Sequence, residues 1–166
     1  MVIYIMNDYK LSKNWTFYIH LQNTNNWDLD SYYKIMTIQN VYECIQLNNN
    51  IGNELLKKAL HFVMKDDIQP IWEDEKNKNG GCFSFKIHNK DIEQIWKYFY
   101  YRLIGNSLMK NKDIMNYVNG ISLSPKKTFC ILKVWMENDT YKDASIFEPI
   151  RYLDFKQCIF KKHIID

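Results

Sequence analysis

The sequence predicts an α+β domain in which helices cover one face of a sheet, and three observations support this. At 166 residues the chain is long enough for one domain but short for two. Hydrophobic residues make up 46% of it and charged residues 25%, which is typical of globular proteins and excludes a disordered chain. Helix and strand patterns are interleaved without strict βαβ alternation. Because neither an internal repeat nor a linker interrupts them, we expect one domain over residues 1–166.

The N-terminal third predicts two strands and a helix. Residues 15–21 and 32–36 are aromatic and β-branched, as strands are, and a polar loop that ends at Trp27 separates them. Thr37 offers an N-cap for a helix that we expect to end in the asparagine run at 48–50. The apolar positions of that helix are Ile38, Val41, Cys44 and Ile45.

The middle of the chain predicts a long loop, a strand and a second helix. Residues 65–81 are polar, with Pro70 early and an Asn-Gly-Gly turn at the end. Residues 82–88 alternate like a strand. Residues 91–103 carry apolar side chains at helical spacing, and Gly105 is placed to end the helix.

The C-terminal part predicts shorter elements. A short helix is expected near residues 113–118, and a strand over 128–135 follows a turn at 124–127. Residues 159–165 predict an edge strand.

Several classes of function lack their sequence signals. There is no glycine-rich phosphate loop, no HExxH and no GxSxG, and the four histidines have no metal-ligand spacing. We therefore expect no catalytic residue, no metal and no cofactor. No apolar run approaches the ~18 residues that span a bilayer, so we expect no membrane partner. A net charge of only +3 argues against broad electrostatic binding of duplex nucleic acid, so any nucleic-acid contact should be local.

The cysteines and the composition bear on compartment and origin. The four cysteines lie far apart without CxxC pairing, which favours reduced thiols in a cytosolic protein. Abundant Asn, Ile, Lys and Tyr indicate an AT-rich genome, such as that of a divergent eukaryotic microbe or a large DNA virus. The expected compartment is the cytoplasm, which for a viral gene is that of the host.

Two tryptophans stand in polar loops rather than on core faces. Trp27 and Trp72 either merely cover the core or form a platform on which a base stacks. Glu73 follows Trp72 directly, and a carboxylate can accept hydrogen bonds from the Watson–Crick edge of guanine. The acidic run at 73–75 can equally be a solvated turn that neighbouring lysines neutralise.

The segment 68–81, which reads IQPIWEDEKNKNGG, closely resembles the signature of the eukaryotic mRNA cap-binding translation initiation factor 4E family. Residues 11–18 resemble the opening strand of that family and residues 96–105 its second helix, so that the resemblance covers roughly residues 9–137. It implies a curved antiparallel sheet of about eight strands. Three helices would back its convex face, and a cap slot would lie on its concave face.

The resemblance also implies roles for individual residues. Trp27 and Trp72 would sandwich the 7-methylguanine of an mRNA cap, Glu73 would pair with its edge, and Trp135 would contact the N7-methyl group. Lys126 and Lys127 would hold the triphosphate. The chain departs from the family at two phosphate positions, where Cys82 replaces an arginine and Ile131 a lysine.

A second surface implied by the resemblance lies on the helices. There the family docks a helix of initiation factor 4G or of a 4E-binding protein. Tyr42 stands here where the family has tryptophan, while Lys97, Tyr98 and Tyr101 stand where it has Leu, Glu and Leu. These departures point to a divergent partner. The expected partner-binding residues are Ile38, Tyr42, Lys97, Tyr101 and Gly105.

The function implied is non-catalytic binding of capped mRNA by a monomer that recruits it for translation initiation. One alternative is a cap-binding repressor or cap-sequestering protein that does not recruit the usual 4G scaffold. A cap-hydrolysing enzyme of the Nudix type would need a long Gly/Glu motif with metal-binding glutamates, which the chain lacks.

Overall fold

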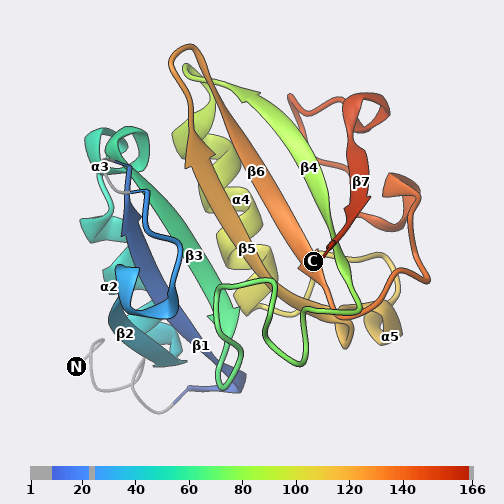
Figure 1. Cartoon of the computed structure of the whole chain (residues 1–166), viewed down its shortest axis with the longest axis horizontal. Coiled ribbons are helices and arrows are strands. Elements are labelled where there is room, and N and C mark those ends of the chain that lie inside the picture. Colours follow the sequence, from blue (N-terminus) through green and yellow to red (C-terminus); the bar gives the residue numbers. More distant parts are fainter. Residues whose placement is uncertain (1–8, 23–24, 165–166) are drawn as a thin grey trace.

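The fold is a seven-stranded antiparallel sheet with helices on one side, seen in a computed structural model that describes residues 9–22 and 25–164 (Figure 1). The strand order is β2-β1-β3-β5-β6-β4-β7. The strands are β1 (Lys10–Leu21), β2 (Tyr32–Asn40), β3 (Ala59–Lys65), β4 (Gly81–His88), β5 (Val118–Pro125), β6 (Phe129–Met136) and β7 (Ile159–Lys162). The predicted α+β class is therefore confirmed, with seven strands in the described residues where about eight are expected.

Four α-helices occur in the described residues. They are α2 (Val41–Asn50), α3 (Asn53–Lys58), α4 (Ile92–Ile104) and the single turn α5 (Lys112–Met115). Three short 3-10 helices accompany them: η1 (Leu29–Ser31), η2 (Ala144–Ile146) and η3 (Phe155–Gln157). No helix of this described part combines the length and hydropathy needed to cross a membrane.

The sheet separates a large core from a small one. On the helix side, α4 buries Ile95, Trp96 and Phe99 against the strands. On the opposite side a smaller apolar cluster includes Leu60, Phe62, Met64, Ile68, Cys82 and Trp135. Side chains of a strand point alternately to its two faces, so β3, β4 and β6 each contribute to both clusters. The smaller cluster forms the floor beneath the loops that carry Trp27 and Trp72.

The first helix begins later than the sequence predicts. β2 continues to Asn40, because Thr37 and Ile38 pair with β1 opposite Thr16 and Trp15. Asn40, not Thr37, caps α2: its side chain accepts a hydrogen bond from the Glu43 amide at 2.9 Å. The predicted cap at Thr37 is wrong because strand pairing continues past it and Asn40 completes a capping motif with Glu43.

The predicted helix over 91–103 is confirmed as α4, and the strands over 82–88 and 128–135 are confirmed as β4 and β6. The C-terminal edge strand is also present as β7, paired with β4; Ile165, the last residue predicted for it, lies outside the described residues. The short helix predicted at 113–118 is wrong beyond its first turn, because β5 begins at Val118.

Candidate functional site

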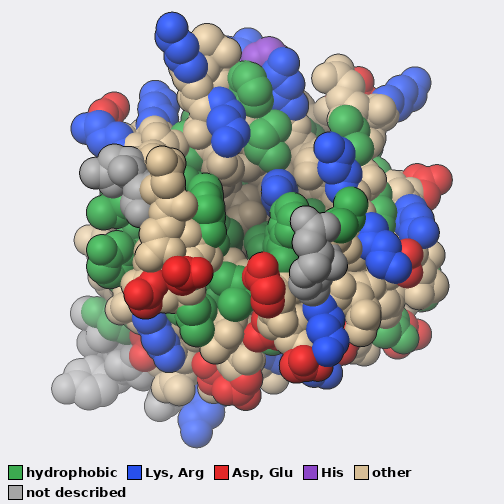
Figure 2. Space-filling model, in the orientation of Figure 1, with side chains coloured by type: hydrophobic (Ala, Val, Ile, Leu, Met, Phe, Trp, Pro, Cys, Tyr) green, Lys and Arg blue, Asp and Glu red, His purple; other side chains and the backbone are tan. Residues whose placement is uncertain are grey.

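A cavity of about 530 Å³ opens on the side of the sheet that faces away from the helices. Its volume is in the range of small-molecule sites. In Figure 2 the hollow has hydrophobic side chains around it, basic side chains above it and carboxylates below it. It is lined by Trp27, Tyr32, Leu60, Phe62, Ile71, Trp72, Glu73, Ser122, Leu123, Ser124, Lys126, Ile131, Lys133 and Trp135. The cavity therefore brings together four predicted base-contacting residues and one of the two predicted phosphate ligands.

One side of the cavity, which we call the Trp27 wall, consists of residues 25–31. Trp27 is 56% exposed, and its ring lies flat on the imidazole of His20, with ring centroids 4.4 Å apart and planes 3° apart. His20 is fully buried on β1 and donates through Nε2 to the carbonyl oxygen of Asn26 at 2.8 Å. The imidazole covers one face of the indole, so the opposite face is the one open to a ligand.

The other side, the Trp72 wall, is the loop of residues 66–80. Trp72 is 40% exposed and stacks on His163 with centroids 5.2 Å and planes 12° apart. His163 donates through Nδ1 to the carbonyl of Asn77 at 2.7 Å, which leaves Nε2 to accept from the Cys82 thiol at 3.1 Å. Burial lowers the pKa of His163 and raises the pKa of Cys82 to about 12. Both shifts favour the uncharged form of the group.

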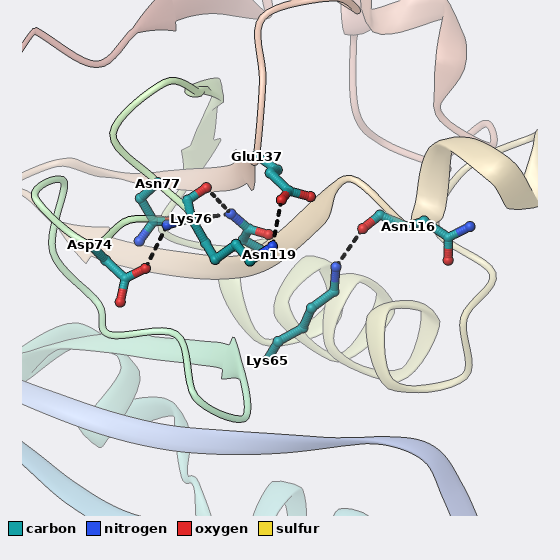
Figure 3. A network of polar contacts seen from close by, with 7 residues as sticks. All are labelled: Lys65, Asp74, Lys76, Asn77, Asn116, Asn119 and Glu137. Atoms are coloured by element: carbon teal, nitrogen blue, oxygen red, sulfur yellow. Dashed lines mark hydrogen bonds and ion pairs between the residues drawn. The ribbon is translucent and has the colours of Figure 1, made fainter.

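Buried amides brace the Trp72 wall against the sheet (Figure 3). Asn77 is fully buried, and its side chain donates to two carbonyl oxygens of the same loop at 2.8 and 2.9 Å. Asn119 on β5 donates to the Lys76 carbonyl at 2.8 Å and to Oδ1 of Asn77 at 3.0 Å. The Asp74 carboxylate accepts from two loop amides at 2.8 and 2.9 Å. These bonds fix the backbone that carries Trp72.

The end of this loop requires glycine. A Cβ at Gly80 would collide with the backbone of Met136 on β6, so the loop can approach the sheet only without a side chain there. The Asn-Gly-Gly signal in the sequence thus marks both a turn and a close approach of two backbones.

Aromatic rings form the floor of the cavity. Trp135 is only 3% exposed, and its Nε1 donates to the hydroxyl of Ser122 at 2.9 Å. Tyr32 packs edge-on against Phe62, and burial raises the pKa of its hydroxyl to about 12. The floor is therefore apolar and uncharged, which suits the flat face and methyl group of a base better than a phosphate.

Charged groups lie at the rim. Glu73 lines the cavity beside Trp72, while Lys126 and Lys133 line it from the β5–β6 turn and from β6. Lys127 is not among the lining residues within the described part of the chain. The sequence argument did not single out Lys133, although its spacing from Trp135 on one strand places both on the same face.

The described residues hold no group of three or more His, Cys, Asp or Glu side chains that could bind a metal ion. The cysteines are free, and three of the four are buried. His61 lies on the helix side of β3, stacked on Phe17, and burial lowers its pKa to about 4. It is a packed core histidine.

The helical surface brings together most of the predicted partner-binding residues. The hydroxyl of Tyr100 on α4 donates to the Cys44 carbonyl on α2 at 2.8 Å, which ties the two helices together. On these helices Tyr101 is exposed, Tyr42 is half-buried, and Lys97 pairs with Glu93 at 2.8 Å.

Two further residues, Gly105 and Ile38, belong to that prediction, and Tyr98 lies on the same helix as Lys97. Gly105 is exposed at the C-terminal end of α4, and the hydroxyl of Tyr98 donates to the Pro149 carbonyl at 3.0 Å. Ile38 lies in β2 and is fully buried, so it offers a partner no surface. Its predicted place on the helix is wrong because the strand extends to Asn40.

Comparison with known sequences gives a consistent family. The chain matches the family model described as "Eukaryotic initiation factor 4E" over residues 10–163. It is 26% identical over 140 residues to the "Eukaryotic translation initiation factor 4E homolog" of Acanthamoeba polyphaga mimivirus, covering 72% of this chain and 52% of that protein. It is 29% identical over 152 residues to the Candida albicans factor 4E, covering 85% of this chain and 71% of that protein. The chain thus spans about half the length of the viral relative.

Comparison with solved structures gives the same fold. A schistosome eIF4E complexed with m7GpppG and 4E-BP superposes with a TM-score of 0.72 at 21% identity, covering 80% of this chain and 74% of that one. Ascaris suum eIF4E-3 with an m2,2,7G cap gives a TM-score of 0.70 at 19% identity, covering 80% and 75%. At these identities the likeness concerns the fold alone.

Proposed function

This chain belongs to the eukaryotic initiation factor 4E family, and we propose that its cavity binds the 7-methylguanosine cap of mRNA. The family consists of translation factors that are not enzymes. One observation supports the proposal most directly: Trp27, Trp72 and Glu73, from two separate loops, line a single cavity of about 530 Å³. The whole chain, residues 1–166, acts in this proposal as one cap-binding domain and as a monomer.

The two indoles supply affinity for a methylated base. Methylation at N7 makes guanine cationic, so the faces of Trp27 and Trp72 attract it electrostatically in addition to stacking. Each face contributes about 1–3 kcal/mol when the base is desolvated. The exposed indoles that line the cavity fit this role, and Trp135 at the floor would contact the N7-methyl group.

Glu73 supplies recognition of guanine. Its carboxylate accepts hydrogen bonds from N1–H and the 2-amino group, and the Trp72 amide donates to O6. Bonds to a charged acceptor contribute about 1.5–3 kcal/mol each before desolvation is subtracted. Together with stacking, these terms predict micromolar or tighter binding, about −8 kcal/mol.

The lysines at the rim supply the phosphate site. Lys126 and Lys133 line the cavity and would pair with the triphosphate, and Lys127 on the same turn adds positive charge outside the lining. Lys133 takes over part of the role that an arginine and a lysine, replaced in this chain by Cys82 and Ile131, have in the family.

The helical surface is the proposed partner site, through which the protein recruits capped mRNA for translation in the cytoplasm. The schistosome relative is complexed with 4E-BP. In this chain the surface comprises Tyr42, Lys97, Tyr101 and Gly105.

The Lys97–Glu93 ion pair puts charges where the family has a leucine. This favours a second candidate function, that of a cap-binding repressor that does not recruit the usual 4G scaffold. Retention of a 4G-derived helical peptide by the protein would support recruitment, and its absence would support repression.

Tryptophan fluorescence tests the proposed cap binding. Titration with 7-methyl-GTP should quench the emission at micromolar concentrations or below, whereas GTP should need a much higher concentration because it lacks the cation. Trp27→Ala and Trp72→Ala should each nearly abolish retention on a 7-methyl-GTP resin. Equal affinity of the wild-type protein for the two nucleotides would overturn the proposal.

A further inference from the structure

A continuous chain of seven rings joined by six contacts, the ring belt, crosses the cavity floor from one wall to the other. Successive ring centroids lie 4.4, 4.8, 5.3, 6.3, 5.2 and 5.2 Å apart. The order of the rings is Trp27, His20, Tyr32, Phe62, Trp135, His163 and Trp72. The two histidines thus occupy equivalent places, each next to the tryptophan at its end of the belt.

The contacts at the two ends of the belt differ from those within it. The inner pairs are tilted or edge-on, with interplanar angles between 56° and 70°. The end pairs are flat, at 3° for His20–Trp27 and 12° for His163–Trp72. A flat contact restricts the plane of an indole that stands on a loop and that would otherwise change its side-chain torsions freely.

Each histidine also holds the backbone of the loop whose ring it supports. His20 donates to the carbonyl of Asn26, the residue before Trp27, at 2.8 Å. His163 donates to the carbonyl of Asn77 in the loop that carries Trp72, at 2.7 Å. Both imidazoles are almost fully buried, with exposures of 0% and 5%. Ring plane and loop backbone are therefore fixed by the same side chain on each side of the cavity.

We propose that His20 and His163 are positioning residues that set the planes of the two cap-stacking indoles. This rests on the proposed cap binding and extends it to two residues that do not touch the cap. A slot whose two indole planes are already fixed loses less conformational entropy when a base enters.

Substitutions at the two sites separate a positioning role from a structural one. His20→Ala and His163→Ala should each weaken 7-methyl-GTP binding about tenfold, which corresponds to about 1.4 kcal/mol. His20→Phe and His163→Phe restore a flat ring without the hydrogen bond, and they should recover affinity to within about threefold of wild type. Leucine at the same sites fills the space without a flat ring, so it should bind as weakly as alanine. Calorimetry measures the affinity, and thermal unfolding measures the folded fraction.

His61 is the matched control. It is fully buried, lies flat on Phe17 at 11° and donates to the Leu55 carbonyl at 2.9 Å, but it faces the helices. His61→Ala should lower the unfolding temperature and leave the 7-methyl-GTP affinity of the folded protein unchanged.

The outcomes distinguish the two proposals. If wild type prefers 7-methyl-GTP and the folded leucine variants bind it as tightly as the phenylalanine variants, the histidines do not position the indoles. An equal loss of affinity in His61→Ala would overturn the inference in the same way. If wild type shows no preference for 7-methyl-GTP over GTP, the proposed function itself fails.

Discussion

The two walls of the cavity present similar rings but are held in different ways. The Trp72 wall is braced by side chains from remote parts of the chain, among them Asn119 and His163. The Trp27 wall is held mainly by bonds within a few residues, such as the Asp28 amide to Asn26 Oδ1 at 2.8 Å and the Ser31 hydroxyl to the Asp28 carbonyl at 2.7 Å. Tertiary contacts therefore fix one wall, and a local turn shapes the other.

The difference matches the tasks proposed for the two walls. The Trp72 wall carries a ring and the carboxylate of Glu73, whose hydrogen bonds depend on distance and angle. The Trp27 wall contributes a stacking ring, and stacking tolerates small displacements. A directional contact needs the more rigid support, so changes in the Trp72 wall should reduce cap affinity most.

Among substitutions of polar residues at the cavity, Glu73→Ala should have the largest effect. Glu73 is the one carboxylate among the described residues that line the cavity, and the Trp27 wall has no equivalent. Removing it leaves two base donors without an acceptor, which should cost about 3 kcal/mol, or more than a hundredfold in affinity. Calorimetric titration with 7-methyl-GTP measures this loss.

The matched control is Glu75→Ala. Glu75 is exposed, pairs with Lys78 at the surface and does not line the cavity. Its removal should change the affinity by less than about twofold, because exposed ion pairs contribute little. An equal loss in the two variants would mean that charge near the cavity, rather than a bond to the base, explains the effect.

Asn77→Ala should have the next largest effect and tests the support of the Trp72 wall. The substitution removes the side-chain donor of two loop carbonyl oxygens and one of the two acceptors of the Asn119 amide, which should cost about 1–3 kcal/mol of folding stability. We expect a lower unfolding temperature and a loss of cap affinity of about tenfold, because the loop carries both Trp72 and Glu73.

Asn79→Ala is the control for this prediction. Asn79 lies in the same loop but is exposed. Its variant should match wild type in both measurements. If Asn77→Ala unfolds earlier but the folded protein binds 7-methyl-GTP as wild type does, the bracing of the wall serves stability alone.

The walls also differ in how far the sequence reveals them. The loop of the Trp72 wall carries local signals, since Pro70, the acidic run and the paired glycines are adjacent in the chain. The residues that brace this loop carry no such local signal. Asn119 and His163 are 42 and 86 residues away from Asn77, their partner, and no local pattern connects them. Contacts that depend on which strands become neighbours are not encoded in the periodicity of a single segment.

The same reason explains the elements that the sequence did not reveal. The central strand β3 is buried on both faces, so it lacks the polar alternation that marks β4. β2 continues past Thr37 because it pairs with β1. Ile38 therefore lies in this strand and in the core, and not on the predicted helix. The amphipathic helix α4, whose pattern is local, was predicted within one residue.

The smallest expected effect concerns Lys126 and Lys127, on the β5–β6 turn next to the Trp27 side of the cavity. Gln22, in the chain just before that wall, donates to the Pro125 carbonyl at 3.0 Å and so ties it to the turn that carries Lys126 and Lys127. Lys126 lines the cavity and Lys127 does not. Lys126→Ala should therefore weaken 7-methyl-GTP binding about threefold, and Lys127→Ala by less than about twofold, since exposed charges are screened. Neither should alter binding of 7-methylguanosine, which has no phosphate, and high salt should abolish the difference in titration. Equal losses for the two lysines would show that this turn acts through its summed charge, in contrast to the directional contact made by the Trp72 wall.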